Sequence, residues 1–230
     1  MRMRERLIER ARLAGADLAG IAPVERLAEA PAGHRPADLM PDARSVIVLA
    51  SRMPEEVIAN TARLTFYTRA MAAKVEFLDQ LAYKMASFLE DNGAKALPVP
   101  ADDPYTFWDA ANRYGAGEIS HKHAAAAAGL GVIGKNTLLV TPKFGNRVAL
   151  VSILTDMNLE ADDILQEELC LPSCRRCVEA CPAGAITDDG RVIQKLCRDR
   201  CGTVLPRGFE AYACWECRRV CPQRGGGGSE

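Results

Sequence analysis

The nine cysteines of this 230-residue chain are confined to one part of it. All of them lie between Cys170 and Cys221, and residues 1–169 contain none. Two runs of closely spaced cysteines end in Cys-Pro, at Cys181 and at Cys221. Bacterial ferredoxins bind [4Fe–4S] clusters with runs of this kind. The spacing therefore predicts iron–sulfur chemistry, that is, the transfer of single electrons.

Two other uses of cysteine match the pattern less well. Structural disulfides form in oxidising compartments, whereas this chain begins without an export signal and has an odd number of cysteines. Zinc sites built from four cysteines use paired Cys-x2-Cys hooks and not triplets followed by Cys-Pro. We therefore prefer iron–sulfur clusters to both.

The motif also predicts which cysteines share a cluster. Three closely spaced cysteines can wrap one side of a cubane, while the cysteine before proline is carried along a helix to the other cluster. Three residues separate Cys170 from Cys174, where two are usual, so the first loop is one residue longer. The first cluster is assigned to Cys170, Cys174, Cys177 and Cys221, and the second to Cys181, Cys214, Cys217 and either Cys197 or Cys201.

Charge is distributed unevenly along the chain. Residues 170–230 contain nine Arg and one Lys against seven acidic residues, although the whole chain has a formal charge of −1. Arginines near a negatively charged cubane stabilise it, but an ordinary solvated basic surface would give the same composition. The overall charge gives no broad positive field for a phosphate backbone, so DNA binding is not expected.

A second stretch that could do chemistry spans residues 117–137. Gly129, Gly131 and Gly134 fit a G-x-G-x-x-G pattern, but they follow a predicted helix and do not open one, which disfavours a dinucleotide-binding fold. A glycine-rich turn still allows a flat or anionic ligand to approach the backbone, with Lys135 and Asn136 as a charge and an amide donor. These five residues are the predicted cofactor-binding loop.

The elements that position these residues have clear signals. Helical spacing occurs at Leu7, Ala11, Leu13 and Leu18, and again from Val75 to Leu89, which predicts two core-facing helices. Residues 45–49 and 148–154 are apolar, β-branched runs typical of buried strands. The five alanines at 124–128 favour a helix. His121 and His123, two apart on that helix, point to different faces and cannot form an i, i+4 metal pair.

Composition sets the expected organisation. Residues 1–165 form an α/β cofactor-binding domain, residues 166–224 form the cysteine-rich domain, and residues 225–230 have the composition of an appended linker. No run is long and apolar enough to span a membrane, and the N-terminal segment is amphipathic and not a secretory signal. The expected location is the cytoplasm.

These features together resemble a known family. Ser45-Val-Ile-Val, the run from His123 to Leu139 around Gly-Leu-Gly-Val-Ile-Gly-Lys-Asn-Thr, Thr155-Asp156 and the Cys-Pro runs are similar to epoxyqueuosine reductases, and more loosely to reductive dehalogenases. The resemblance implies an α+β protein, in which a nitroreductase-like α/β domain that binds cobalamin precedes a ferredoxin-like domain with two [4Fe–4S] clusters. Flavin is the fallback for cobalamin.

The resemblance also implies a function. Electrons would pass from a donor such as ferredoxin or flavodoxin through the clusters to cobalamin and then to a small molecule or a modified nucleoside, with no membrane partner. The sixteen-residue spacing from Cys181 agrees with Cys197 as the last ligand of the second cluster. The chain is thus expected to be an iron–sulfur, corrinoid-dependent reductase. The alternative is a non-catalytic electron carrier or corrinoid-handling protein.

Two departures from the family bear on that choice. Gly115 occupies the position where epoxyqueuosine reductases carry a catalytic aspartate, so Glu118, His121 or Tyr114 would have to supply the proton. Those enzymes also continue into a helical-repeat domain that helps hold tRNA, and only a few residues follow Cys221 here. The substrate therefore stays open at this point.

Overall fold

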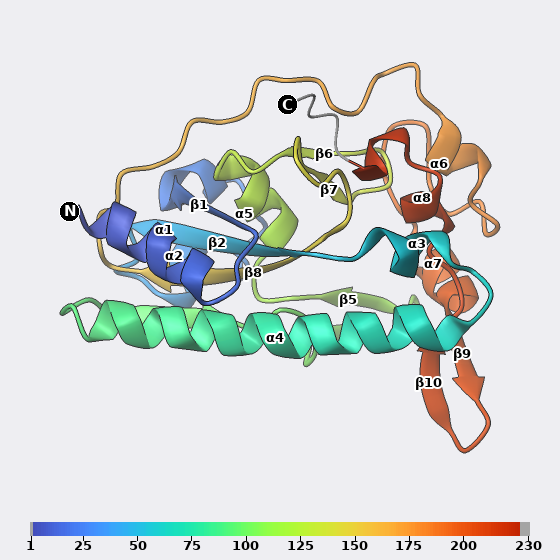
Figure 1. The fold of residues 1–230 in the computed structure, drawn as a ribbon, viewed down its shortest axis with the longest axis horizontal. Coiled ribbons are helices and arrows are strands. Elements are labelled where there is room, and N and C mark those ends of the chain that lie inside the picture. Colours follow the sequence, from blue (N-terminus) through green and yellow to red (C-terminus); the bar gives the residue numbers. More distant parts are fainter. Residues whose placement is uncertain (1, 226–230) are drawn as a thin grey trace.

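A computed structural model describes residues 2–225 and is built around a four-stranded antiparallel sheet. The two predicted strands lie at its centre and pair along their whole length, from Ser45 opposite Thr155 to Arg52 opposite Val148. Helices cover both faces of the sheet, which explains why these strands are continuously apolar (Figure 1). The strand order is β1 (Leu18–Pro23), β2 (Ser45–Arg52), β8 (Val148–Thr155), β3 (Ala96–Val99).

Alternate residues of β2 supply two separate cores. Ile47 and Leu49 pack with α1 (Met3–Leu13) and α4 (Leu64–Glu90) on one face. Val46 and Val48 pack with α5 (His121–Ala127) on the other face. The sheet thus carries a helical layer on each side, and the residues of the predicted cofactor loop follow α5 directly.

The first helix is shorter than its sequence pattern predicts. It ends at Leu13, and Gly15, with φ of +105°, turns the chain so that Leu18 begins β1 and is not part of the helix. Leu7 and Ala11 are buried as expected, whereas Leu13 is 79% exposed. The prediction that Leu13 and Leu18 continue a core-facing helix was wrong, because the apolar spacing runs across a helix end.

The long helix α4 begins eleven residues before the predicted stretch. Its C-terminal half packs on the sheet through Leu78, Leu81 and Leu89. Its N-terminal half instead contacts the cysteine-rich segment, where the ring of Tyr67 stacks on Trp215 with centroids 4.4 Å apart. One helix therefore supports both parts of the molecule (Figure 1).

The cysteine-rich segment consists of short elements. Residues 156–175 run without regular secondary structure from the end of β8 to α6 (Arg176–Glu179), along the upper edge of the molecule in Figure 1. The elements that follow are α7 (Gln194–Cys201), β9 (Gly202–Leu205), β10 (Phe209–Tyr212), α8 (Glu216–Arg219) and the 3-10 turn η2 (Pro222–Gly225).

Smaller elements complete the α/β part. They are η1 (Val24–Leu27), α2 (Pro36–Leu39), α3 (Glu55–Ala59), and two hairpins, β4 (Phe107–Asp109) with β5 (Tyr114–Ala116) and β6 (Val132–Ile133) with β7 (Leu139–Val140). The mixed α/β prediction is confirmed at this level. Over residues 2–225, no helix has the length and apolar character needed to cross a membrane. The predicted linker at 225–230 lies outside the described residues except for Gly225.

Candidate iron–sulfur site

The four thiols predicted for the first cluster lie near one another. Burial raises the pKa of the Cys221 thiol, and the neighbouring thiols of Cys170, Cys177 and Cys174 raise it further. Burial likewise raises the pKa of Cys177, with Cys170 and Cys174 adding to the shift. Cys177 lies on α6 and Cys221 directly follows α8, two helices in mutual contact. We call Cys170, Cys174, Cys177 and Cys221 the outer thiol group.

A second set of thiols comes from α7 and from the residues at the start of α8. The sulfurs of Cys197 and Cys201 are 3.5 Å apart, and the Cys201 thiol donates to the carbonyl of Cys214 at 3.4 Å. Burial raises the pKa of Cys217 to about 12, and the thiols of Cys197 and Cys214 contribute. We call Cys197, Cys201, Cys214 and Cys217 the inner thiol group. Cys197 and Cys201, the two candidates for the last ligand of the second cluster, both belong to this group.

The two groups are close enough to influence one another. The thiol of Cys177, in the outer group, is among the charges that raise the pKa of Cys217, in the inner group. Cys181 follows α6, and its sulfur accepts a hydrogen bond from the backbone N–H of Ala185 at 3.3 Å. Hydrogen bonds to sulfur stabilise cluster thiolates. The ligand role of Cys181 in the second cluster stays a prediction.

The donor chemistry of these residues fits iron–sulfur clusters. A cubane takes four thiolates. The outer thiol group supplies four cysteines, while the inner group supplies Cys214, Cys217 and one of Cys197 or Cys201, with Cys181 as the predicted fourth ligand. In residues 2–225, no three His, Cys, Asp or Glu side chains lie close enough together to hold a single metal ion.

The loop after α5 binds the cysteine-rich segment. The ammonium of Lys135 donates to the carbonyl of Cys174 at 2.8 Å and to that of Pro172. The amide of Asn136 donates to the carbonyl of Cys217 at 3.0 Å. One residue thus holds the backbone of the outer thiol group, and its neighbour holds that of the inner group.

The glycines of the same loop are required by the chain's own packing. Gly129 has φ of +72°, and a Cβ at this position would lie 2.1 Å from the carbonyl oxygen of Asp163. A Cβ at Gly131 would lie 2.2 Å from the carbonyl oxygen of Val140, and one at Gly134 would lie 3.1 Å from the side chain of Asn136. The role of these glycines, Lys135 and Asn136 in binding a cofactor stays a prediction.

Gly115 lies on β5, where the resemblance leads one to expect an aspartate. It is buried, and its N–H and carbonyl both pair with the side-chain amide of Gln194 on α7, each at 3.2 Å. A Cβ here would lie 3.0 Å from the ring of Tyr105 and 3.1 Å from that of Trp108. The space that a longer side chain would need is therefore occupied by aromatic rings.

Sequence reasoning missed a polar and aromatic group beside Gly115. The hydroxyl of Tyr105 donates to Asp102 at 2.5 Å, and burial, followed by this hydrogen bond, raises the pKa of Tyr105 to about 12. The guanidinium of Arg198 lies 5.5 Å from the ring of Tyr105 and 5.0 Å from that of Trp108. Since Arg198 follows Cys197, the group links the inner thiols to the β4–β5 hairpin. The density of acidic and aromatic residues at 102–109 could have indicated it.

The three candidate proton donors differ in their surroundings. Glu118 accepts a hydrogen bond from the hydroxyl of Thr106 and is half-buried. Tyr114 is exposed, with its ring edge-on to Phe107. Both ring nitrogens of His121 are engaged, by the hydroxyl of Ser152 and the carbonyl of Pro100, each at 2.8 Å. Burial lowers the pKa of His121, so the ring is neutral.

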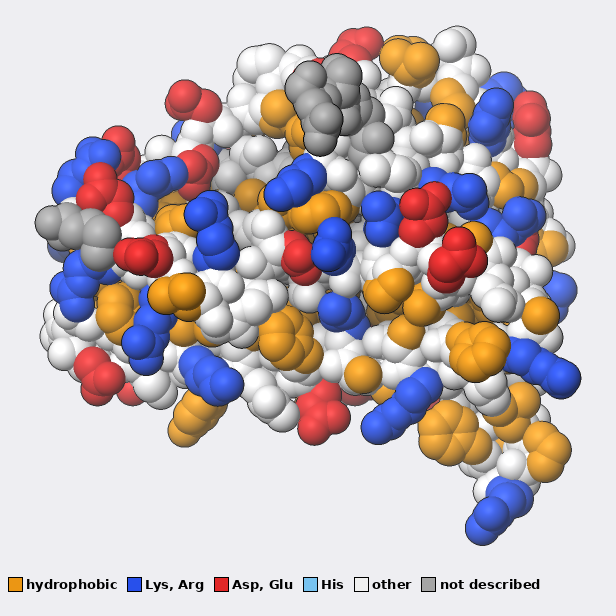
Figure 2. Space-filling model, in the orientation of Figure 1, with side chains coloured by type: hydrophobic (Ala, Val, Ile, Leu, Met, Phe, Trp, Pro, Cys, Tyr) orange, Lys and Arg blue, Asp and Glu red, His pale blue; other side chains and the backbone are white. Residues whose placement is uncertain are grey.

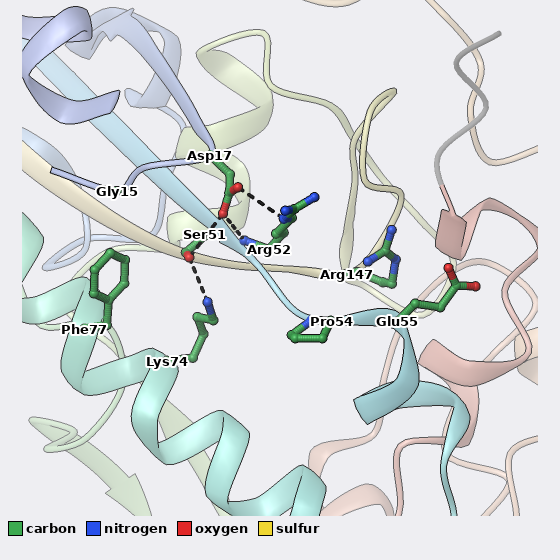
Figure 3. A pocket seen from close by; sticks show the side chains of 9 residues that line it. All are labelled: Gly15, Asp17, Ser51, Arg52, Pro54, Glu55, Lys74, Phe77 and Arg147. Atoms are coloured by element: carbon green, nitrogen blue, oxygen red, sulfur yellow. Dashed lines mark hydrogen bonds and ion pairs between the residues drawn. The ribbon is translucent and has the colours of Figure 1, made fainter. Parts of the chain in front are cut away.

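A polar hollow of about 560 Å³ lies between β2 and α4 (Figure 3). Lys74 reaches into it from α4 and donates to the hydroxyl of Ser51 at 2.9 Å, while burial lowers its pKa. Asp17 accepts from the backbone N–H of Arg52 at 2.8 Å and pairs with its guanidinium. None of the residues predicted to bind a cofactor lines this hollow.

Comparison with known proteins confirms the resemblance. The chain is 29% identical to the epoxyqueuosine reductase of Bacillus subtilis over 198 residues, which are 80% of this chain and 48% of that protein. It is 28% identical to the tetrachloroethene reductive dehalogenase of Dehalobacter restrictus over 227 residues, 90% of this chain and 36% of that one. No family model matches the chain.

A solved structure shares the fold. An epoxyqueuosine reductase crystallised with an epoxyqueuosine-modified tRNA-Tyr stem loop superposes with a TM-score of 0.63 at 24% identity, covering 96% of this chain and 64% of that one. The chain spans about half the length of the Bacillus subtilis protein.

Proposed function

We propose that this protein is an iron–sulfur reductase of the epoxyqueuosine reductase type, which passes electrons through two [4Fe–4S] clusters to a cobalamin cofactor and a modified nucleoside of tRNA in the cytoplasm. The observation that carries the proposal is the pair of thiol groups, adjacent to one another and fixed to the α/β part by Lys135 and Asn136. The similarity to epoxyqueuosine reductases supports the substrate class.

The proposal assigns a role to each part. Residues 1–165 are a nitroreductase-like cofactor domain, and residues 166–224 are a ferredoxin-like domain. The irregular connection at 156–175 contains the boundary, which supports this division. Tyr67 and Trp215 hold the two domains together through their stacked rings.

The cluster ligands follow the same division. The outer thiol group holds one cluster, and Cys181, Cys214, Cys217 and Cys197 hold the other. Each cluster supplies one-electron transfer. The buried guanidinium of Arg218, which follows Cys217, donates to the backbone carbonyls of Asn146 and Val148 and lowers the pKa of Cys217. Its positive charge favours the anionic thiolate form that a cluster requires.

The cofactor would lie beside the clusters, near the loop of residues 129–136. Cobalamin supplies, when bound, the metal centre at which a substrate is reduced. The side chains of Lys135 and Asn136 bind backbone carbonyls of the cysteine loops. Their role would therefore be to fix these loops next to the cofactor and not to contact the cofactor directly. The aromatic rings of Tyr105 and Trp108 and the exposed ring of Phe107 offer the apolar surface that a large flat cofactor needs. Flavin is the alternative that such a surface would also accept.

Glu118 is the best placed of the candidate proton donors. It is half-buried three residues before α5, and its carboxylate accepts a hydrogen bond from the hydroxyl of Thr106. His121 uses both nitrogens internally, which leaves it no proton to give without breaking a bond to Ser152 or Pro100.

One observation favours a second function. Gly115 offers no acidic group, and a Cβ at this position would crowd the rings of Tyr105 and Trp108. A protein without that proton donor could pass electrons to a partner, or carry a corrinoid, without reducing a substrate itself.

A single experiment distinguishes the reductase from the non-catalytic carrier. The protein is reconstituted anaerobically with iron, sulfide and cobalamin, reduced with dithionite and incubated with an epoxyqueuosine-containing tRNA stem loop. Conversion of the epoxide, measured by mass spectrometry of the nucleosides, supports the reductase. Bound cobalamin and reduced clusters without conversion would favour the carrier. Protein that binds neither iron nor cobalamin would overturn both.

A further inference from the structure

A basic hollow opens directly beside the outer thiol group. Its volume is about 780 Å³, and Cys221 forms part of its wall. Three arginines line it, Arg176, Arg219 and Arg224, against one carboxylate, Glu179. Figure 2 shows basic and acidic side chains intermixed over the end of the molecule that carries α6 and α8. A predicted cluster ligand thus lies in the wall of a hollow that more basic than acidic side chains line.

The arginines are held in place by different partners. Arg219 pairs with Glu216 at 2.6 Å, and Arg224 lies 3.8 Å from Glu55 and donates to the carbonyl of Arg219 at 3.1 Å. Arg176 is exposed on α6, at the rim. Its charge is therefore the most available to an approaching molecule.

The two thiol groups are placed differently relative to this hollow. The inner group is attached to the α/β part, since Asn136 binds the carbonyl of Cys217, and the adjacent Trp215 is buried and donates to the carbonyl of Ile58. The outer group borders the hollow through Cys221. An electron delivered at the hollow would therefore enter through the outer group and could then pass to the inner one.

We propose that this hollow is the docking site of an acidic one-electron carrier protein, which delivers electrons to the cluster of the outer thiol group. The inference rests on the proposed function. In each encounter the reduced carrier loses one electron and the cluster gains it, and no bond forms or breaks. Complementary charge raises the rate of such encounters by tenfold or more at low ionic strength.

A nucleic acid fits the same surface less well. A phosphate backbone is held by several basic side chains in a row, whereas Arg219 and Arg224 already pair with Glu216 and Glu55. A carrier protein needs only a small matching patch around its own redox centre. The position of Cys221 in the wall gives an electron donor a reason to bind here that a phosphate backbone lacks.

The test uses the cluster-loaded chain and purified reduced flavodoxin as the carrier. Stopped-flow bleaching of the cluster absorbance gives the rate constant for reduction, and titration with oxidised flavodoxin gives its affinity. Arg176→Glu should lower the rate constant by about 10-fold at low salt, weaken binding and reduce the salt dependence. Arg176→Gln should give a smaller loss in the same direction.

The control is Arg12→Glu, which makes the same charge change on an exposed residue of α1, at the other end of the molecule (Figure 1). Dithionite should reduce wild type and all variants at equal rates, because it needs no docking surface. Equal flavodoxin rates for Arg176→Glu and Arg12→Glu, with normal dithionite reduction, would overturn the docking site alone. Weakened binding of a tRNA stem loop, with carrier-dependent reduction unchanged, would assign the hollow to nucleic acid instead. Absence of any cluster absorbance in wild type would overturn the proposed function.

Discussion

Cys197 and Cys201 lie one turn apart on α7, so both sulfurs face the same thiol group, and only one of them is needed to complete a cluster. The geometry leaves both within reach of Cys214 and Cys217. The hydrogen bond from the Cys201 thiol to the carbonyl of Cys214 gives Cys201 a role without iron.

We therefore expect Cys197→Ser to lose one cluster and Cys201→Ser to keep both. Anaerobically reconstituted wild type should contain about eight iron atoms per chain, and a lost cluster would lower this to about four. Iron and sulfide analysis of the two variants measures how many clusters each one retains. Eight irons in Cys197→Ser and four in Cys201→Ser would reverse the assignment.

The ring of His121 should make stability depend on pH. Burial lowers its pKa, an effect that the carboxylates of Asp79 and Asp102 oppose only in part. The unfolded chain, whose histidine pKa is about 6.5, therefore binds the proton more readily. The contribution of the neutral His121 ring to the free energy of unfolding is therefore complete above about pH 6.5 and is lost as the pH falls below this value.

We expect the urea midpoint of wild type to fall from about pH 8 to about pH 6, and His121→Gln to remove part of that fall. His123→Gln should remove a smaller part of the fall, because burial also lowers the pKa of His123 but its side chain is exposed. An identical pH dependence in His121→Gln and wild type would contradict a neutral His121 ring.

How far a residue's role could be predicted from the sequence depended on where its partners lie. The grouping of Cys170, Cys174 and Cys177 follows from local spacing, and the structure places Cys221 with them. The acidic and aromatic residues at 102–109 could have drawn attention to Tyr105, but its contact with Arg198 joins residues 93 positions apart, so no local pattern indicates that partner. Lys135 and Asn136 were noticed for their chemistry, yet their partners, the carbonyls of the cysteine loops, carry no side-chain signal.

Among the elements, α4 shows why periodicity predicts only part of a helix. Its C-terminal half packs on a sheet and carries the leucines that make a regular stripe. Its N-terminal half packs on the cysteine-rich segment through Tyr67 and Thr68, and the hydroxyl of Thr68 accepts the N–H of Tyr212 at 3.0 Å. Aromatic and hydroxyl contacts do not produce an apolar stripe, so the sequence pattern begins too late.

A side chain at Gly131 would clash with the β6–β7 hairpin, so a substitution there should affect the stability of the fold. A Cβ there would lie 2.2 Å from a backbone oxygen of Val140, which cannot move without shifting the hairpin. We expect Gly131→Ala to lower the free energy of unfolding by about 1–3 kcal/mol, measured by urea unfolding.

Gly117 provides the matched control, because a Cβ there would meet nothing closer than the carbonyl oxygen of Ile119 at 3.7 Å. Gly117→Ala should change stability by less than about 0.5 kcal/mol. Equal stabilities for the two variants would show that the loop adapts. Loss of cofactor binding in a Gly131 variant is therefore informative only when its fold is shown to be intact.

At the scale of the whole molecule, the two parts are stabilised by different means. The α/β part has two apolar cores packed on either face of one sheet. The cysteine-rich segment has short helices and few fully buried apolar side chains, among them Ala185 and Trp215. A segment with so small a core requires another source of stability, which metal ligation by its cysteines would supply.

Removal of iron should therefore unfold one part and leave the other. We expect a chelator, added to the reduced cluster-loaded protein, to make the backbone amides of α6, α7 and α8 exchange with deuterium much faster, while those of β2 and β8 stay protected. Hydrogen–deuterium exchange with mass spectrometry measures both regions in one sample. Limited proteolysis should then cut first after residue 165. The N-terminal half of α4 should loosen with the cysteine-rich segment, because Tyr67 loses its stacking partner Trp215. Unchanged protection of α7 and α8 after complete iron removal would show that apolar packing alone holds the segment, and would remove the structural role of the clusters.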